Sequence, residues 1–249
     1  EIKKEGQVIL FLNRRGYASF LSCKSCGYVP KCERCDISLT YHKGKKTLKC
    51  HYCNYQEEIL TVCPSCQEKG LDDIGIGTEM IEEEVKSLYK DATIFRMDRD
   101  TVSKKGDHSR ILSAFKDSKG SILIGTQMIG KGLDFPNVNL VGVINADQGL
   151  NIPDFRSQER TFSIIEQVGG RAGRGKEQGK VIVQSFSPGN FTLKYIEKHD
   201  YEGFYNEEIK LRECFSYLPF GNIIRVLVTG LDDKKTGDAI MRIKDALEF

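Results

Sequence analysis

Eight of the nine cysteines occur as four CxxC pairs within residues 23–66. A CxxC turn directs two thiolates toward one point, and two such turns form the tetrahedral sulfur cage that Zn²⁺ prefers. The four pairs therefore predict two structural Zn²⁺ ions. A disulfide scaffold and redox-active CxxC pairs are the alternatives, but disulfide-rich domains are usually short secreted chains. The charged opening segment 1–5 has no hydrophobic signal region, which favours a cytosolic zinc protein.

The four CxxC turns can combine into two sites in three ways, and their spacing favours the nested combination. Segment 36–49 separates the second turn from the third and is long enough for a short hairpin, as in a zinc ribbon. The sequential combination would fold the first turn onto the second across Gly27–Lys31, which contains Pro30, and it stays the alternative. The nested sites are an outer one, Cys23, Cys26, Cys63 and Cys66, and an inner one, Cys32, Cys35, Cys50 and Cys53.

Two other side chains of the right types are left out of these sites. His51 lies inside the third turn, but four complete CxxC pairs leave no position for it. Cys214 lies far along the chain in an amphipathic stretch, so we expect a buried apolar residue rather than a ligand.

A glycine-rich motif, Gly125–Pro136, directly follows an apolar strand pattern. It nearly spells the phosphate-binding loop GxxxxGK[ST], but Gly132 stands where the Mg²⁺-binding hydroxyl is required. The chain contains no other such loop and no acidic magnesium box after a strand. We therefore reject a nucleotide P-loop here.

The second motif, Gln167–Arg174, reads QVGGRAGR at the end of a predicted helix. Small residues separate Arg171 from Arg174, so both guanidinium groups can reach a phosphate, as arginine fingers do in phosphoryl transfer. The alternative is a glycine-rich helix end with solvated arginines.

Overall charge carries no information about nucleic acid. The formal charge of +2 becomes −2 once eight thiolates and two Zn²⁺ ions are considered. The hydrophobic share of 39% is typical of a globular protein, and no apolar run is long enough to cross a membrane. Basic residues do cluster locally in three places, which leaves nucleic-acid contact open. The clusters are Lys43, Lys45, Lys46 and Lys49; Arg14 and Arg15; and Arg171, Arg174, Lys176 and Lys180.

Short apolar runs alternate with helical patterns outside the cysteine region, which predicts an α/β fold with a parallel sheet covered on both faces. The expected strands are Val8–Leu12, Asp73–Ile76, Thr93–Met97, Ser121–Gly125, Leu140–Asn145 and Lys180–Phe186. The expected helices are Glu79–Tyr89, His108–Phe115, Ser157–Val168 and Asn190–Lys210.

The cysteine region interrupts this pattern after the first strand, so it reads as an insertion into an α/β domain. We expect that domain at 1–20 and 67–212 and the zinc-binding insertion at 21–66. A turn at Leu218–Gly221, a strand at Asn222–Thr229 and a helix at Thr236–Leu247 predict the beginning of an α+β C-terminal domain at 213–249.

The motifs together resemble a known helicase family. The segments at 125–136 and 167–174 are similar to motifs V and VI of superfamily 2 helicases, which belong to a RecA-like second lobe. Further matches occur in the order found in the PriA family of primosomal helicases (primosomal protein N′). These are the segment 11–17, the four CxxC turns, Gly77–Glu79, Met97–Thr101, Asp154–Ser157 and Glu159–Arg160.

This resemblance implies an ATP-driven 3′→5′ DNA helicase of the bacterial cytoplasm and nucleoid, active as a monomer. Such a protein recognises forked and single-stranded DNA and restarts stalled replication with primosome loader proteins and single-strand-binding protein. ATP and Mg²⁺ would be held mainly by a first lobe whose motifs are missing from this sequence. We therefore expect the chain alone to neither hydrolyse ATP nor unwind DNA.

The resemblance also implies roles for single residues. Arg171 and Arg174 would face the ATP γ-phosphate, and Gln167 would contact the nucleotide or the attacking water. Gly132 and Asp134 would lie at the lobe interface, with Asp134 against the ribose. Four residues after strand ends would contact DNA: Thr126, Gln127, Arg14 and Arg15.

Two other functions stay open. A zinc-ribbon adaptor that binds nucleic acid without catalysis would explain the cysteines, but it leaves Gln167–Arg174 without a role. Another helicase of the superfamily, acting on RNA, would explain the arginines but not the nested CxxC turns.

Overall fold

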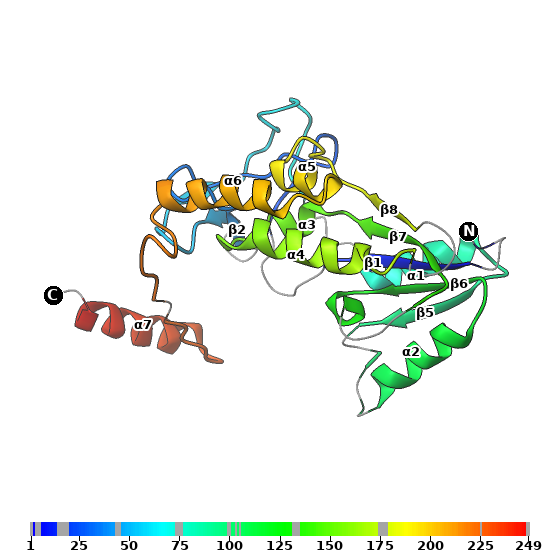
Figure 1. Cartoon of the computed structure of the whole chain (residues 1–249). Helices are drawn as coiled ribbons and strands as arrows, with labels where there is room; N and C mark the ends of the chain where they lie inside the picture. The colour runs from blue at the N-terminus through cyan, green and yellow to red at the C-terminus, as the bar shows by residue number, and fades with distance from the viewer. Residues whose placement is uncertain are drawn as a thin grey trace. The chain divides into compact units, whose positions relative to one another are not determined.

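The structure is a computed structural model, and it describes residues 2, 6–13, 20–42, 46–72, 77–98, 101, 102, 104, 106–130, 135–173, 179–224 and 226–247. By its internal contacts the chain divides into two units, Glu1–Leu211 and Arg212–Phe249. The first unit contains a five-stranded sheet and a small three-stranded sheet (Figure 1). Within the described ranges, no helix is long and apolar enough to span a membrane.

All neighbouring strands of the larger sheet run parallel, in the order β5-β6-β1-β7-β8. The central strand β1 is buried along almost its whole length, as expected of a strand covered on both faces. The predicted α/β class is therefore confirmed. The strands are β1 (Gln7–Leu12), β5 (Thr93–Met97), β6 (Ser121–Gly125), β7 (Val138–Ile144) and β8 (Lys180–Val183).

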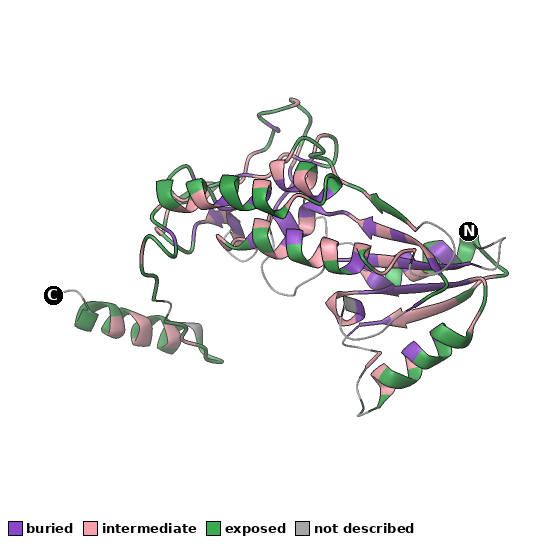
Figure 2. Cartoon of the chain, in the orientation of Figure 1, coloured by how far each residue is buried: buried purple, intermediate pink, exposed green. Residues whose placement is uncertain are grey.

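Alternate residues of β1 face two different core clusters because side chains alternate along a strand. Ile9 and Phe11 pack in a cluster that includes residues of α2 and α4. Val8 and Leu12 pack in the other cluster, which includes residues of α1. Figure 2 shows the buried residues gathered in the strands and on one side of the helices. These helices are α1 (Thr78–Leu88), α2 (Asp107–Asp117) and α4 (Ser157–Gly169).

The segment expected to form one helix, 190–210, forms two, α5 (Phe191–Glu197) and α6 (Tyr201–Cys214). His199 interrupts the helix with a φ of 53°, in the left-handed region. Asp200 Oδ1 then accepts a hydrogen bond from Gly203 N at 2.8 Å, which satisfies a backbone donor at the start of α6. This local cap competes successfully with helix continuation, and apolar spacing alone does not report it.

The small sheet is antiparallel and lies in the sequence between β1 and α1. Each of its strands has three residues, and its buried side chain Leu48 is 0% exposed. We call residues 20–72 the zinc module. A bridge between Ser22 and Asp72 joins its two ends through reciprocal backbone hydrogen bonds of 2.9 Å. The strands are β2 (Thr40–His42), β3 (Thr47–Lys49) and β4 (Gln56–Glu58).

Three sequence expectations need correction or lie outside the described residues. No strand forms in the described part of 222–229, where Ile224 is 91% and Leu227 70% exposed, because a strand needs a partner to satisfy its backbone groups. The segment continues into α7 (Asp233–Leu247). The strand expected at 73–76 is outside the described part of the chain. β8 also ends at Val183, short of Phe186.

The expectation that Cys214 is buried is wrong, because its thiol is exposed at the end of α6. The buried residues of α6 are Phe204 and Glu208, four positions apart on one side of the helix. At 3.6 residues per turn, a residue six positions beyond Glu208 lies on another side.

Candidate functional site

The eight CxxC cysteines form two groups of four, and within each group the sulfur atoms lie within 4.8 Å of one another. The Sγ–Sγ distance is 3.6 Å for Cys23–Cys66 and 3.5 Å for Cys32–Cys53. A disulfide bond is about 2.0 Å long, whereas sulfurs held about 2.3 Å from a tetrahedral Zn²⁺ lie about 3.8 Å apart. The spacing therefore fits two zinc cages, and the pairing is the nested one. The groups are Cys23, Cys26, Cys63 and Cys66, and Cys32, Cys35, Cys50 and Cys53.

Each of the four CxxC pairs forms a backbone turn of the same type. In the first, Cys23 N donates to Tyr28 O at 2.9 Å, and Gly27 N donates to Cys23 O at 2.8 Å. The same two hydrogen bonds recur in the other three turns at 2.8–3.0 Å. The residue after the second cysteine always has a positive φ, which glycine, asparagine and aspartate adopt most readily. These residues are Gly27 (75°), Asp36 (46°), Asn54 (61°) and Gln67 (63°).

Backbone N–H groups of the turns stabilise thiolates. The N–H of Cys26 lowers the pKa of the Cys23 thiol to about 7. The N–H of Tyr55 likewise lowers the pKa of Cys53 to about 7. Each group of four thus holds one cysteine that readily takes the thiolate form, which is the form that binds a metal. Four thiolates leave Zn²⁺ no open position for water, so the arrangement suits structural rather than catalytic zinc.

Two sequence motifs meet at the carboxyl end of the large sheet. Thr126 and Gln127 directly follow β6, and Gln127 begins the short helix η2 (Gln127–Gly130). Gln127 Nε2 donates to the Oδ1 atom of Asn13 at 3.1 Å, and Asn13 follows the neighbouring strand β1. The two predicted DNA-contacting residues that the structure describes therefore lie at the end of the sheet where open α/β folds bind ligands.

Gln167 and Arg171 lie at the opposite end of this sheet. Helix α4 begins beside α3 (Asp147–Leu150), which follows the carboxyl end of β7. The chain beyond α4 returns to the start of β7, where Gly173 N donates to Val138 O at 3.0 Å. Gln167 is exposed in the last turn of α4, and Arg171 is partly buried in the following turn.

Five predicted site residues lie outside the described part of the chain. They are Arg14, Arg15, Gly132, Asp134 and Arg174. The ribbon lysines Lys43 and Lys45 are also outside it. The structure therefore places two of the four predicted DNA contacts and two of the five predicted nucleotide contacts, and it separates the two pairs to opposite ends of the sheet.

Known proteins match both the cysteine-rich segment and almost the whole chain. Residues 32–57 match the family model described as the PriA DNA helicase Cys-rich region (CRR) domain. Over 92% of its length, the chain is 50% identical to the Replication restart protein PriA of Bacillus subtilis (strain 168). The chain is a homologue of part of PriA.

Two further PriA proteins have similar identities to this chain. The identity is 42% over 96% of the chain for Synechocystis sp. and 42% over 92% for Rickettsia conorii. The chain spans only 28%, 29% and 36% of the lengths of the three relatives. The PriA resemblance inferred from the motifs is confirmed, for a segment about one third of the relatives' length.

The zinc module of this PriA homologue packs through a glycine against the segment that follows β8. Three of the four turns hold a residue other than glycine at the same positive φ, so the backbone conformation alone does not require Gly27. A Cβ atom at Gly27 would overlap Cβ and Cγ of Phe186, three residues beyond the end of β8. Gly27 is therefore required by the close approach of the module to the sheet, a contact that sequence reasoning missed.

We expect Gly27→Ala to destabilise the zinc-loaded chain more than Gly70→Ala does. Both glycines have a positive φ, 75° and 83°, so each substitution costs about 1–2 kcal/mol of backbone strain. Gly70 has no atom within 4 Å of its added Cβ, whereas Gly27 meets Phe186 and loses about 1–3 kcal/mol more by overpacking. Denaturant unfolding with zinc present measures the difference, and equal losses in the two variants would contradict the contact.

A second contact joins the module to the start of α4. Tyr52, in the third CxxC turn, accepts a hydrogen bond on its hydroxyl from Phe155 N at 3.4 Å. Asp154, the residue before Phe155, forms ion pairs with Arg156 at 2.9 Å and with Arg160 of α4 at 2.7 Å. Although burial opposes it, these arginines lower the pKa of Asp154 to about 2. Both module contacts thus lie at the carboxyl end of the sheet, which is the end that Thr126 occupies and not the end that Arg171 occupies.

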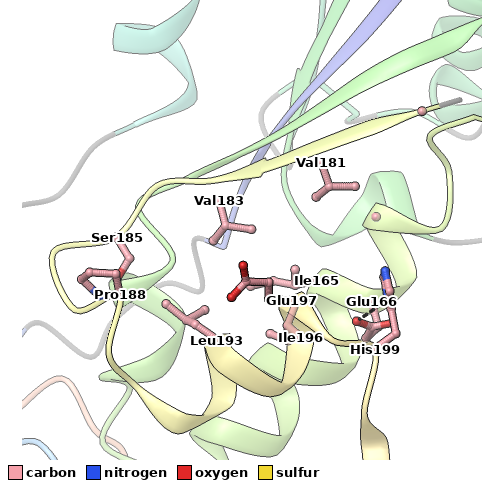
Figure 3. A pocket seen from close by; sticks show the side chains of 12 residues that line it. Ile165, Glu166, Val181, Val183, Ser185, Pro188, Leu193, Ile196, Glu197 and His199 are labelled. Carbon is pink, nitrogen blue, oxygen red and sulfur yellow. Dashed lines mark hydrogen bonds and ion pairs between the residues drawn. The ribbon is translucent and has the colours of Figure 1, made fainter.

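A separate cavity of about 480 Å³ lies between β8, α4 and α5 (Figure 3). Its lining is largely apolar, with Val181, Val183 and Leu193 among the lining residues. At one side His199 Nδ1 lies 3.1 Å from the carboxylate of Glu166. Among the described residues, none of the predicted site residues lines this cavity, so the predicted chemistry does not depend on it.

Proposed function

We propose that this chain is the second RecA-like lobe and zinc module of an ATP-driven 3′→5′ DNA helicase. The complete protein would recognise forked DNA and restart stalled replication in the bacterial cytoplasm by assembling a primosome. The observation that carries this proposal is 50% identity to a Replication restart protein PriA over 92% of the chain. We assign 1–20 and 67–212 to the lobe, 21–66 to the zinc insertion and 213–249 to the beginning of a C-terminal domain.

The amino end of the sheet would face the nucleotide. Arg171 and Arg174 would stabilise the charge on the transferring γ-phosphate, as arginine fingers do. Gln167, one turn earlier on an exposed helix end, would contact the nucleotide or the attacking water. Gly132 and Asp134, which precede β7 in the sequence, would lie at the lobe interface, with Asp134 against the ribose.

The carboxyl end of the sheet would hold one DNA strand. Thr126 and Gln127, with Arg14 and Arg15, would contact phosphates without reading the base sequence. Asn13 supports this role because its hydrogen bond holds the Gln127 side chain in place. Closure of the lobes around ATP, with Mg²⁺ offsetting phosphate charge, would pull this end along the strand, and hydrolysis would release it.

The eight CxxC cysteines would hold two structural Zn²⁺ ions, since the sulfur spacing and the four identical turns fit tetrahedral thiolate sites. Gly27 and Tyr52 of the module contact Phe186 and Phe155, in the segments after β8 and before α4, at the end of the sheet that would face DNA. This position supports a role in separating strands or docking partners. The proposed partners are forked and single-stranded DNA, primosome loader proteins and single-strand-binding protein, and we propose a monomer.

The test is ATP hydrolysis and unwinding by the full-length protein that contains this chain. We expect forked DNA to stimulate both activities, and we expect the isolated chain to show neither because it lacks a GxxxxGK[ST] loop. Tight fork binding by the full-length protein without ATP hydrolysis would instead support the zinc-ribbon adaptor.

A further inference from the structure

Two histidines meet on the surface of the zinc module, outside both cysteine groups. The Nε2 atoms of His42 and His51 lie 3.3 Å apart. The ring centroids are 5.1 Å apart and the ring planes are tilted by 55°. Both imidazoles therefore direct the same nitrogen toward one point.

This separation has the value that a shared metal ion requires. A Zn–N bond is about 2.0–2.1 Å long, so two nitrogens of a tetrahedral site lie about 3.3–3.4 Å apart. Neutral imidazole is the ligand that borderline divalent ions such as Zn²⁺, Ni²⁺ and Cu²⁺ accept. Without a metal, the Nε2–H of one ring donates a hydrogen bond to the unprotonated Nε2 of the other, so the observed distance fits both arrangements.

The folded module holds both rings in place. His42 ends β2 and pairs with Thr47 across the small sheet. His51 follows Cys50, whose N–H donates to Tyr55 O at 2.8 Å inside the third turn. The backbone positions are thus set by the strand pairing and by the inner cysteine group, which lowers the cost of organising the two ligands.

The pair is also accessible to a hydrated ion. His51 is exposed and His42 is partly exposed. Two protein ligands leave the other coordination positions to water, in contrast to the closed shells of the four-thiolate groups. An ion held in this way would exchange more readily than the structural zinc ions.

We propose that His42 and His51 form a third metal site, which binds one borderline divalent cation through their two Nε2 atoms. The proposal rests on the geometry of the module and does not depend on the helicase function. It requires that the loss of either ring removes the site, because each supplies one of its two protein ligands.

The experiment is a calorimetric titration of Ni²⁺ into the 249-residue chain that already holds two zinc ions. We expect one Ni²⁺ to bind per chain, and both His42→Ala and His51→Ala to lose this binding while they retain two zinc ions. His199→Ala is the matched control, because His199 is another exposed histidine, and it should bind Ni²⁺ as the original chain does. Ni²⁺ binding that survives either module variant, or that His199→Ala removes, would overturn the proposal.

A second measurement keeps the proposal testable if a module variant loses its zinc. Long-range ¹H–¹⁵N spectra of the unsubstituted zinc-loaded chain report the two imidazoles directly during addition of a third equivalent of Zn²⁺. We expect the Nε2 resonances of His42 and His51 to shift together. A shift of only one of them, or of neither, contradicts a shared ion.

Discussion

Replacement of Cys50 by serine is expected to lower the zinc content of the chain from two ions to one and to unfold the inner part of the module. Cys50 is 0% exposed and belongs to the inner group. Structural zinc in small modules contributes about 10–16 kcal/mol of folding free energy. The small sheet has strands of only three residues, so little else is available to stabilise it.

The outer zinc and the large sheet should survive this change. The ends of the module are joined independently by the Ser22–Asp72 backbone bridge and by the ion pair of Lys24 with Asp72. The two core clusters of the large sheet contain no described residue of the module. We therefore expect new proteolytic cleavage only within the inner ribbon, between the second and third CxxC turns.

Zinc analysis with limited proteolysis measures the effect, and Cys214→Ser is the matched control. The thiol of Cys214 is exposed and belongs to neither group of four, so its loss should leave two zinc ions bound. A Cys50→Ser chain that still binds two zinc ions, or a Cys214→Ser chain that binds fewer than two, would contradict the assignment.

Arg171→Ala is expected to reduce the fork-stimulated ATP hydrolysis of the full-length protein by about 10³-fold, the lower end of the range for arginine fingers. Arg171 lies in the turn after α4, at the amino end of the sheet and away from the module contacts. Its removal should therefore slow the chemical step and leave fork affinity nearly unchanged. Arg174→Ala should reduce hydrolysis at least as much.

Arg110→Ala provides the control for a lost surface arginine. Arg110 is 78% exposed on α2 and pairs with Asp107 of the same helix at 3.1 Å, a type of pair that contributes little to stability. Steady-state hydrolysis with saturating ATP and forked DNA compares the three variants, and circular dichroism confirms that each is folded. An Arg171→Ala protein that hydrolyses ATP as fast as Arg110→Ala would remove Arg171 from the catalytic group.

Local patterns were sufficient to predict most elements of the large sheet. The run Ile122–Ile124 is apolar throughout because a parallel strand is buried on both faces, and this leaves a direct pattern in the sequence. The helix expected at 157–168 forms at Ser157–Gly169, and the strand expected at 180–186 forms at Lys180–Val183. The spacing of the turns also favoured the nested cysteine groups, since loop length limits which turns can meet.

Other features depend on competition between local interactions, and the sequence patterns did not resolve them. The helix break at His199 arises because Asp200 caps the next helix. The strand expected at 222–229 has the right composition but finds no partner strand among the described residues of its unit. The exposure of Cys214 follows from which side of α6 faces the core.

For this protein, the sequence by itself determined most elements of the large sheet, the eight CxxC cysteines and the PriA relationship, because each depends on residue type and spacing along the chain. Only the tertiary structure decided which ends of the sheet Gln127 and Arg171 occupy, that Gly27 meets Phe186, and that His42 meets His51. These contacts join residues that no local pattern relates. They exist because the parallel strand order and the two cysteine groups bring distant segments together.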